Sequence, residues 1–435
     1  MGSELWDEDG VRYLDTRNNV AHVGHQNPEV VLAVQKQVAT LNTNTRYLHP
    51  TIVMLAEKLL QLFPNDKFQK VYFVNSGSEA NDLALRLARA HTQSLHTIVL
   101  DHAYHGHTYA TLQVSPYKFN HSQESILQSN PHIIKVPCPN LYRGLHSNNN
   151  RKEEDTNTIM DGYAKNVKDA CREVMDRGER LGSFIVEGGM SVAGVILPPS
   201  RYMKQCIQAV REAGGVYIAD EVQTGLGRLG TCTWAFELSG EVPDIVTIGK
   251  PFGNGMPLAA VVTTQEISTS FQTMGVEYFN TFGGNPVCAA AGLAVLNVLE
   301  SQNLQQHAFN VGTYLQSQLQ QLQSTLITKK SSSILQIGDI RGSGLFLGVE
   351  FIKHNVDSNR VIQPATLETS FLCSVLKEKY HILTSIDGPD NNVLVIKPPM
   401  SFSQENSQTF ISALEAAILV DLAQTNLSLV TKTPT

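Results

Sequence analysis

The sequence IADEVQ occupies residues 218–223, and TIGKP follows at residues 247–251. Each stretch overlaps or follows a short apolar run, at 216–219 and 244–248, and apolar runs that end at polar residues or glycine are typical of buried strands. Asp220 and Lys250 therefore stand at the ends of two predicted strands. Ligands of open α/β sheets bind at the carboxyl ends of strands, so we expect both side chains in one crevice.

This pair of side chains indicates a particular chemistry. A lysine in a protein crevice is partly desolvated, which lowers its pKa and suits it to form a Schiff base. A nearby carboxylate would keep the ring nitrogen of pyridoxal phosphate protonated, as that cofactor requires for drawing electrons from its substrate. Lys250 is the candidate covalent residue and Asp220 the candidate partner of the ring nitrogen. Alternatively, the lysine is a solvated charge and the aspartate a helix cap.

The sequence NSGSEAN at residues 75–81 forms a second motif. It follows the apolar run 71–74 and precedes apolar residues with helical spacing, which predicts a strand, a tight turn and a helix start. Free N–H groups at a helix N-terminus bind phosphate, and small residues let the anion approach. Ser76, Gly77 and Ser78 are the candidate ligands of the cofactor phosphate, unless the serine is an ordinary helix cap.

A third motif, DHAYHGH at residues 101–107, follows the strand-like run 97–100. Tyr104 offers an aromatic face beside a glycine, where a flat ring could stack. The histidines form neither a repeated Cys/His set nor a helical pair at i and i+4, so no metal is expected.

The strand-like runs also predict the domain organisation. Runs beginning near residues 71, 97, 183, 216, 244 and 259 alternate with helical stretches, which predicts a mostly parallel sheet covered by helices on both faces. We assign this large domain to residues 46–292 and a smaller α+β domain to residues 293–435. Residues 1–45 are interpreted as an N-terminal segment that is truncated. The polar runs 147–158 and 329–333 are expected to be surface insertions.

Together these motifs resemble the class III, pyridoxal-phosphate-dependent aminotransferase family, from about residue 5 to about residue 422. The resemblance implies an α/β protein of fold type I and a homodimer with shared active sites. It also implies a role for each matching position. Lys250 would bind the cofactor as an aldimine, Asp220 would pair with the ring nitrogen, Gln223 would lie near the ring hydroxyl and Tyr104 would stack on the ring. Thr281 would reach the cofactor phosphate of the neighbouring subunit, and Glu187 would end a strand that lines the site.

Two positions distinguish this chain from amino acid aminotransferases of the same family. Those enzymes commonly hold the substrate α-carboxylate with an arginine three residues before a Pro-Pro pair, and here Val395 occupies that position. The glutamate that neutralises this arginine in ornithine aminotransferase corresponds to Val192. A carboxylate buried without a cation is strongly penalised, so we expect the reacting amine on a carbon without a carboxylate.

Four phrases resemble the phospho-lyase branch of the family, which comprises ethanolamine-phosphate phospho-lyase and 5-phosphohydroxy-L-lysine phospho-lyase. They are NVAHVGH at 19–25, LNTNTRYLH at 41–49, SPYKF at 115–119 and YRG at 142–144. Residues 275–282 and 296–300 are more similar to the phosphohydroxylysine enzyme. The resemblance implies elimination of phosphate and ammonia from a phosphorylated amine, with 5-phosphohydroxy-L-lysine giving 2-aminoadipate semialdehyde.

Three alternatives stay open. The substrate could be phosphoethanolamine, giving acetaldehyde, or the protein could be an ω- or other class III aminotransferase. The sequence EGGMS at residues 187–191 departs from the branch pattern, so an inactive homologue with a binding or structural role is the third alternative.

A leaving phosphate needs cations, and arginine binds its oxygens through paired hydrogen bonds. Arg46, Arg143 and Lys397 are the candidates, and Arg46 is preferred because its flanking sequence is branch-like. Each of them could instead be a surface or structural charge.

Composition agrees with a soluble enzyme of 435 residues, 42% hydrophobic and 17% charged. The net charge of −7 gives no reason to expect nucleic acid, and no apolar run of about twenty residues suggests a membrane span. Six scattered cysteines favour a reducing compartment. Read directly, the chain is cytosolic and carries no targeting segment, whereas its resemblance to the phosphohydroxylysine enzyme implies mitochondria.

Overall fold

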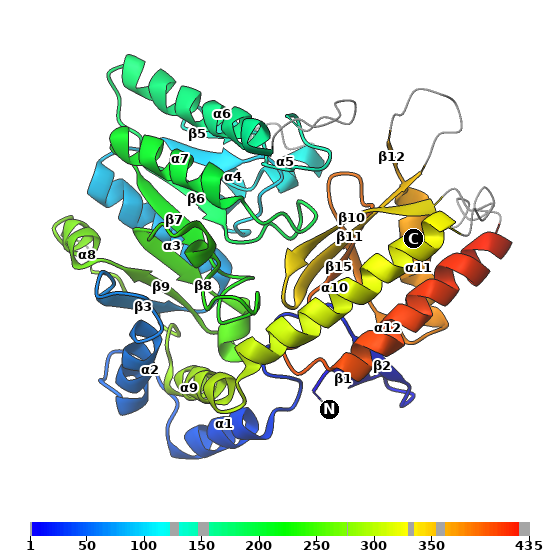
Figure 1. Cartoon of the computed structure of the whole chain (residues 1–435). Helices are drawn as coiled ribbons and strands as arrows, with labels where there is room; N and C mark the ends of the chain where they lie inside the picture. The colour runs from blue at the N-terminus through cyan, green and yellow to red at the C-terminus, as the bar shows by residue number, and fades with distance from the viewer. Residues whose placement is uncertain are drawn as a thin grey trace.

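The computed structural model describes residues 2–121, 130–146, 156–275, 277–328, 335–353 and 362–425 (Figure 1). The predicted insertion at 329–333 lies outside these residues, as do residues 147–155 of the other one. Residues 156–158 begin helix α6.

A seven-stranded sheet with the order β3-β9-β8-β7-β6-β4-β5 forms the centre of the larger part of the chain. Its strands are β3 (Lys70–Val74), β4 (Thr97–Leu100), β5 (Ile133–Val136), β6 (Ser183–Glu187), β7 (Val216–Asp220), β8 (Ile245–Ile248) and β9 (Ala259–Thr263). β9 is antiparallel to both of its neighbours, and the other pairs are parallel. The predicted mostly parallel sheet is therefore confirmed, with β5 as an additional strand.

Different helices cover the two faces of this sheet (Figure 1). The main ones are α3 (Gly77–Thr92), α6 (Thr156–Asp176), α7 (Ser200–Glu212) and α8 (Gln265–Gln272). Ile98 of β4 shares a core with Tyr163 of α6 and Tyr202 of α7, whereas the next residue, Val99, shares a core with Leu83 of α3. Because side chains alternate along a strand, strands covered on both faces are mostly apolar, and the polar residues of these strands lie mainly at their ends.

Short helical segments join these elements near the carboxyl ends of the strands. They are α4 (Tyr109–Gln113), α5 (Pro116–His121), the 3-10 turn η2 (Ala235–Ser239) and the 3-10 turn η3 (Lys250–Gly253).

The smaller part is an antiparallel sheet with helices on it, as the sequence predicts for the C-terminal region. Its strands are β10 (Leu335–Ser343), β11 (Phe346–Lys353), β15 (Val393–Ile396) and β14 (Ser385–Asp387) in that order, and β12 (Gln363–Pro364) pairs with β11. Its helices are α10 (Leu304–Thr328), α11 (Thr366–Glu378), α12 (Gln404–Ala416) and the π-helical turn η4 (Ala417–Leu422). In Figure 1, α10 and α12 run side by side over this part.

The N-terminal segment belongs to both parts. β1 (Glu4–Trp6) pairs with β2 (Arg12–Asp15), and β2 also pairs in parallel with β13 (Ile382–Leu383) of the C-terminal region. Helices α1 (Pro28–Thr40) and α2 (Pro50–Leu60) pack against α9 (Pro286–Ser301) of the large part. The boundary predicted at 292/293 falls inside α9, whose residues share cores with both parts of the chain. α9 is apolar around most of its circumference, which hid its end in the sequence pattern.

Two observations concern the predictions made from composition. Among the described residues no single helix is long and apolar enough to span a membrane, and α9 and α10 reach that length and composition only as a pair bent by 62°. The six cysteines are all free.

Candidate active site

Three neighbouring strands deliver charged residues to one edge of the sheet. Glu187 ends β6 and lies opposite Asp220 at the end of β7, and Lys250 begins the turn that follows β8. Together with Ser76, Gly77, Ser78, Tyr104 and Gln223 they line one cavity of about 360 Å³. The structure therefore brings together all the predicted cofactor residues except Thr281.

The N-terminus of α3 forms one wall of this cavity. Ser76 is the N-cap, and its Oγ accepts from Glu79 N at 3.2 Å, so the first-turn N–H groups point toward the cavity. A Cβ on Gly77 would lie 2.7 Å from Val222 Cγ1, so this close approach requires glycine. Ser78 Oγ accepts from His107 N at 3.1 Å, which joins the helix to the Tyr104 loop. The wall has the donors that an anion needs.

Asp220 is held in place by side chains from three other segments. Its Oδ2 accepts from Asn81 Nδ2 at 2.7 Å and from His105 Nδ1 at 2.8 Å, and Thr247 Oγ1 donates to Asn81 Oδ1 at 2.7 Å. Asp220 is 4% exposed, so these bonds replace water around its carboxylate. The sequence analysis missed Asn81 and His105, although both lie inside quoted motifs. Asn81 follows Gly77 by one helical turn, the signal that could have found it.

Burial also perturbs the other charges in the cavity. It lowers the pKa of Lys250, against the opposing effects of Asp220, Glu187 and Asp387. Glu187 is 3% exposed, and desolvation raises the pKa of its carboxyl to about 7. Its Oε1 accepts from Tyr104 N at 2.9 Å, while its Oε2 has no partner among the described residues. Such perturbed groups in a cleft indicate a functional site.

These residues fit pyridoxal phosphate. A buried amine is available to its aldehyde, a buried carboxylate to its ring nitrogen and a helix N-terminus to its phosphate. The buried His105 Nε2 has no protein partner among the described residues and lies at the cavity wall, where a ring could cover it.

Of the three cations predicted for the substrate phosphate, Lys397 is the one that lies beside this cavity. Its Nζ donates to Ser191 Oγ at 2.7 Å and to Gln223 Oε1 at 3.4 Å, and it lies 4.0 Å from Asp387 Oδ2. Burial lowers the pKa of Lys397 to about 8, although Asp387 opposes this effect. Through Gln223, this lysine adjoins the cavity of Lys250.

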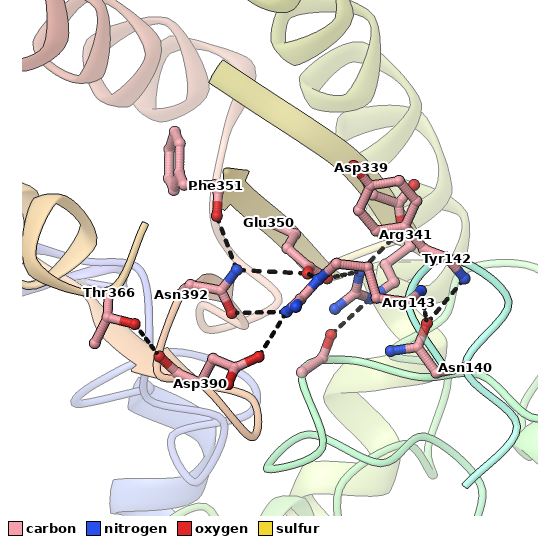
Figure 2. Close-up of polar contacts among 11 residues, drawn as sticks. Asn140, Tyr142, Arg143, Asp339, Arg341, Glu350, Phe351, Thr366, Asp390 and Asn392 are labelled. Carbon is pink, nitrogen blue, oxygen red and sulfur yellow. Dashed lines mark hydrogen bonds and ion pairs between the residues drawn. The ribbon is translucent and has the colours of Figure 1, made fainter. Parts of the chain in front are cut away.

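Arg143 lies in a cluster of ion pairs, which favours the alternative that it is a structural charge (Figure 2). It is ion-paired through Nε with Glu350 and donates from Nη2 to Asp390 Oδ2 at 2.9 Å. Arg341 Nη1 binds the other oxygen of Glu350 at 2.6 Å. This cluster lines a separate cavity of about 250 Å³ between the 140–146 loop and the small part. The acids around Arg143 already satisfy its charge.

Arg46 and Thr281 are exposed and do not line the cavity of their own chain. Arg46 is on the loop between α1 and α2, and its guanidinium lies 4.8 Å from the ring centroid of Phe279. The preference for Arg46 as a phosphate ligand therefore has no support within one subunit. The predicted reach of Thr281 into a neighbouring subunit stays a prediction.

The fold and this constellation define a pyridoxal-phosphate-dependent enzyme of the class III type. The chain matches the family Aminotransferase class-III over residues 1–418 and belongs to that family. Its cofactor is pyridoxal phosphate, which is also bound in a solved amine transaminase of the same fold.

Named relatives include both aminotransferases and phospho-lyases. The chain is 44% identical over 411 residues to "Alanine--glyoxylate aminotransferase 2-like" of Drosophila melanogaster, covering 94% of this chain and 80% of that protein. It is 41% identical over 420 residues to "Ethanolamine-phosphate phospho-lyase homolog 1" of Caenorhabditis elegans, covering 95% of this chain and 86% of that protein. A phospholyase from Arthrobacter, solved in complex with phosphoethanolamine, superposes with a TM-score of 0.85 at 34% identity, covering 98% of this chain and 93% of that one.

Proposed function

We propose that the chain is a pyridoxal-phosphate-dependent phospho-lyase that eliminates phosphate and ammonia from a phosphorylated amine. The observation that carries this proposal is the environment of Val395. Its side chain is fully buried in an apolar cluster with Leu229 and Phe346, where amino acid aminotransferases of the family carry an arginine. Among the described residues that line the Lys250 cavity, none is an arginine. A substrate α-carboxylate would therefore be buried without its usual cation.

Lys397 supplies a cation at a different point of the same edge. It follows β15 two residues after Val395, and residues two apart project to the same side of an extended chain. Its amine lies beside Gln223 and Ser191, and its side chain is 14% exposed. A buried ammonium next to a hydroxyl suits the compact charge of a leaving phosphate.

The preferred substrate in this proposal is 5-phosphohydroxy-L-lysine, which the similarity of residues 275–282 and 296–300 to that enzyme supports. Phosphoethanolamine is the second candidate, because the Arthrobacter phospholyase was solved in complex with it. An aminotransferase is the competing reaction, since the Drosophila relative carries that name.

The residues of the chain divide the work of such a reaction. When bound, the cofactor withdraws electrons from the carbon that bears the substrate nitrogen. Lys250 Nζ, with its lowered pKa, removes the proton from that carbon. Asp220 keeps the ring nitrogen protonated, and Asn81 and His105 orient its carboxylate. Lys397 stabilises the negative charge that develops on the departing phosphate.

The bonds of this elimination balance without an added oxidant or acceptor. The C–H bond breaks, its proton goes to Lys250 and its electrons form a carbon–carbon double bond. The adjacent C–O bond breaks, and its electrons leave with phosphate. A proton returns to the carbon that carried the phosphate, which converts the carbon–carbon double bond into a carbon–nitrogen double bond. Water then replaces nitrogen on the carbon, so the products are an aldehyde, ammonia and phosphate.

We also propose that the protein is a homodimer. Tyr47 is 74% exposed, Leu48 is 88% exposed and Phe282, next to Thr281, is 67% exposed. Large apolar side chains exposed to this extent are favoured where another chain covers them. Mitochondrial location, implied by resemblance to the phosphohydroxylysine enzyme, stays a prediction.

The experiment measures phosphate and ammonia released from each phosphorylated amine, with pyridoxal phosphate present and no keto acid. Equal release of the two products supports elimination, and the amine with the higher kcat/KM is the substrate. Activity that appears only when a keto acid is added would identify the protein as an aminotransferase. Absence of turnover with retained cofactor would indicate an inactive homologue. The Lys250→Ala variant is the negative control.

A further inference from the structure

An acid faces the proposed phosphate cation. Asp387 is the last residue of β14, which pairs antiparallel with β15, and its Oδ2 lies 4.0 Å from Lys397 Nζ. Ser191 Oγ lies between the two groups, accepting from Lys397 at 2.7 Å and donating to Asp387 at 3.4 Å. Lys397 and Asp387 are thus linked through a hydroxyl and make no short direct bond.

This loose arrangement differs from a structural ion pair in the same part of the molecule. Glu350 is bound directly by Arg143 and Arg341, at 2.6 Å for Arg341. Asp387 accepts a long hydrogen bond, 3.4 Å, from Ser191 Oγ. Burial raises the pKa of Asp387, so its carboxylate is poorly solvated as well as weakly bonded. A carboxylate in this state is easily displaced from its cation.

We propose that Asp387 is a specificity-determining residue that neutralises Lys397 until a phosphate dianion takes its place. This inference rests on the proposed function, in which Lys397 binds the phosphate of the substrate. A substrate carboxylate carries the same single charge as Asp387 and gains little by competing for Lys397. A phosphate dianion carries twice that charge and offers three oxygens, so it displaces the Asp387 carboxylate from Lys397. Asp387 thereby selects phosphorylated amines over amines with a carboxylate.

Neighbouring charges agree with this selection. Arg17 lies close enough to act electrostatically on both Asp387 and Lys397, and the Thr16 carbonyl accepts from Lys397 N at 2.8 Å. A dianion bound at Lys397 would therefore have a second cation nearby. Lys250 also acts electrostatically on both groups. One carboxylate among three cations leaves a net positive charge, which favours the more highly charged anion.

The test is titration calorimetry of the holoenzyme with inorganic phosphate and, separately, with acetate. Asp387→Asn should bind phosphate about tenfold more tightly than the parent and should bind acetate measurably, because Lys397 loses its competitor. Asp387→Ser removes the same charge with a smaller side chain and should show the same gain. Lys397→Met combined with Asp387→Asn should abolish the gain. Asp66→Asn, an exposed acid just before β3, is the control for net charge and should match the parent.

The sign of the effect separates this role from a structural one. Damage to the fold would weaken phosphate binding, whereas loss of a competing carboxylate strengthens it. Unchanged or weaker phosphate binding by folded Asp387→Asn and Asp387→Ser would overturn the inference. Failure of the proposed function is detected separately, as absence of phosphate release from any phosphorylated amine by the parent enzyme.

Discussion

Replacing Lys397 with methionine should lower kcat/KM for the phosphorylated amine by about 10- to 150-fold. Methionine keeps most of the volume and removes the ammonium. Lys397 is only 14% exposed and its amine is bonded to Ser191, so water cannot readily replace its charge. A hydrogen bond to a charged group contributes about 1.5–3 kcal/mol, and this range converts to the stated loss.

The assay follows phosphate release at several substrate concentrations. Lys165→Met removes an exposed lysine on α6, which pairs with Asp169, and should leave kcat/KM unchanged. Lys397→Arg keeps a positive charge and should recover part of the activity. A kcat/KM for Lys397→Met within about twofold of the parent, in a variant that retains its cofactor, would refute the assignment of Lys397.

Three further predictions follow from the structure. Lys250→Ala should abolish turnover and the visible absorbance of a lysine-bound cofactor; retained turnover would contradict the mechanism. The folded pKa of Glu187 is raised to about 7, so its contribution to stability is present below its unfolded pKa and is lost as pH rises through 7. Glu187→Gln should therefore stabilise the cofactor-free protein against urea unfolding, by up to about 3 kcal/mol above pH 7 and by less toward pH 4.5. If the gain in stability did not change with pH, it would not arise from the raised pKa of Glu187. Arg143→Ala should lower the free energy of unfolding by about 2 kcal/mol, which is less than the loss of a whole buried ion pair because Arg341 still binds Glu350. In the same denaturation assay, Arg177→Ala at an exposed position should lower it by under about 1 kcal/mol. Equal losses in the two variants would contradict the account of the cluster.

The large sheet was predictable because its signal is local. Strands β7 and β8 are buried on both faces and are therefore mostly apolar, apart from Asp220 and Thr247, and this pattern is visible within four or five residues. The motif at Gly77 is local as well, since a cap, a glycine and a helical face lie within a few residues of one another. Asp220 ends one such strand and Lys250 follows the other after one glycine, which is why the sequence could place them at one edge.

The partners of these residues were not predictable in the same way. Asp220 meets Asn81 and His105 across 139 and 115 positions, and no periodicity in the sequence records such a contact. The N-terminal strand β2 joins β13 near the other end of the chain for the same reason.

The sequence alone was enough to predict the mostly parallel sheet and the candidate cofactor residues that line the Lys250 cavity, because strand periodicity and helix-start chemistry are properties of short segments. The three candidate cations could be distinguished only in the folded chain. Arg46, Arg143 and Lys397 carry the same charge in the sequence, but one is exposed, one is held by Glu350 and Asp390, and one is buried beside the Lys250 cavity. The difference arises because the role of a charge depends on its burial and its partners, and distant segments supply both.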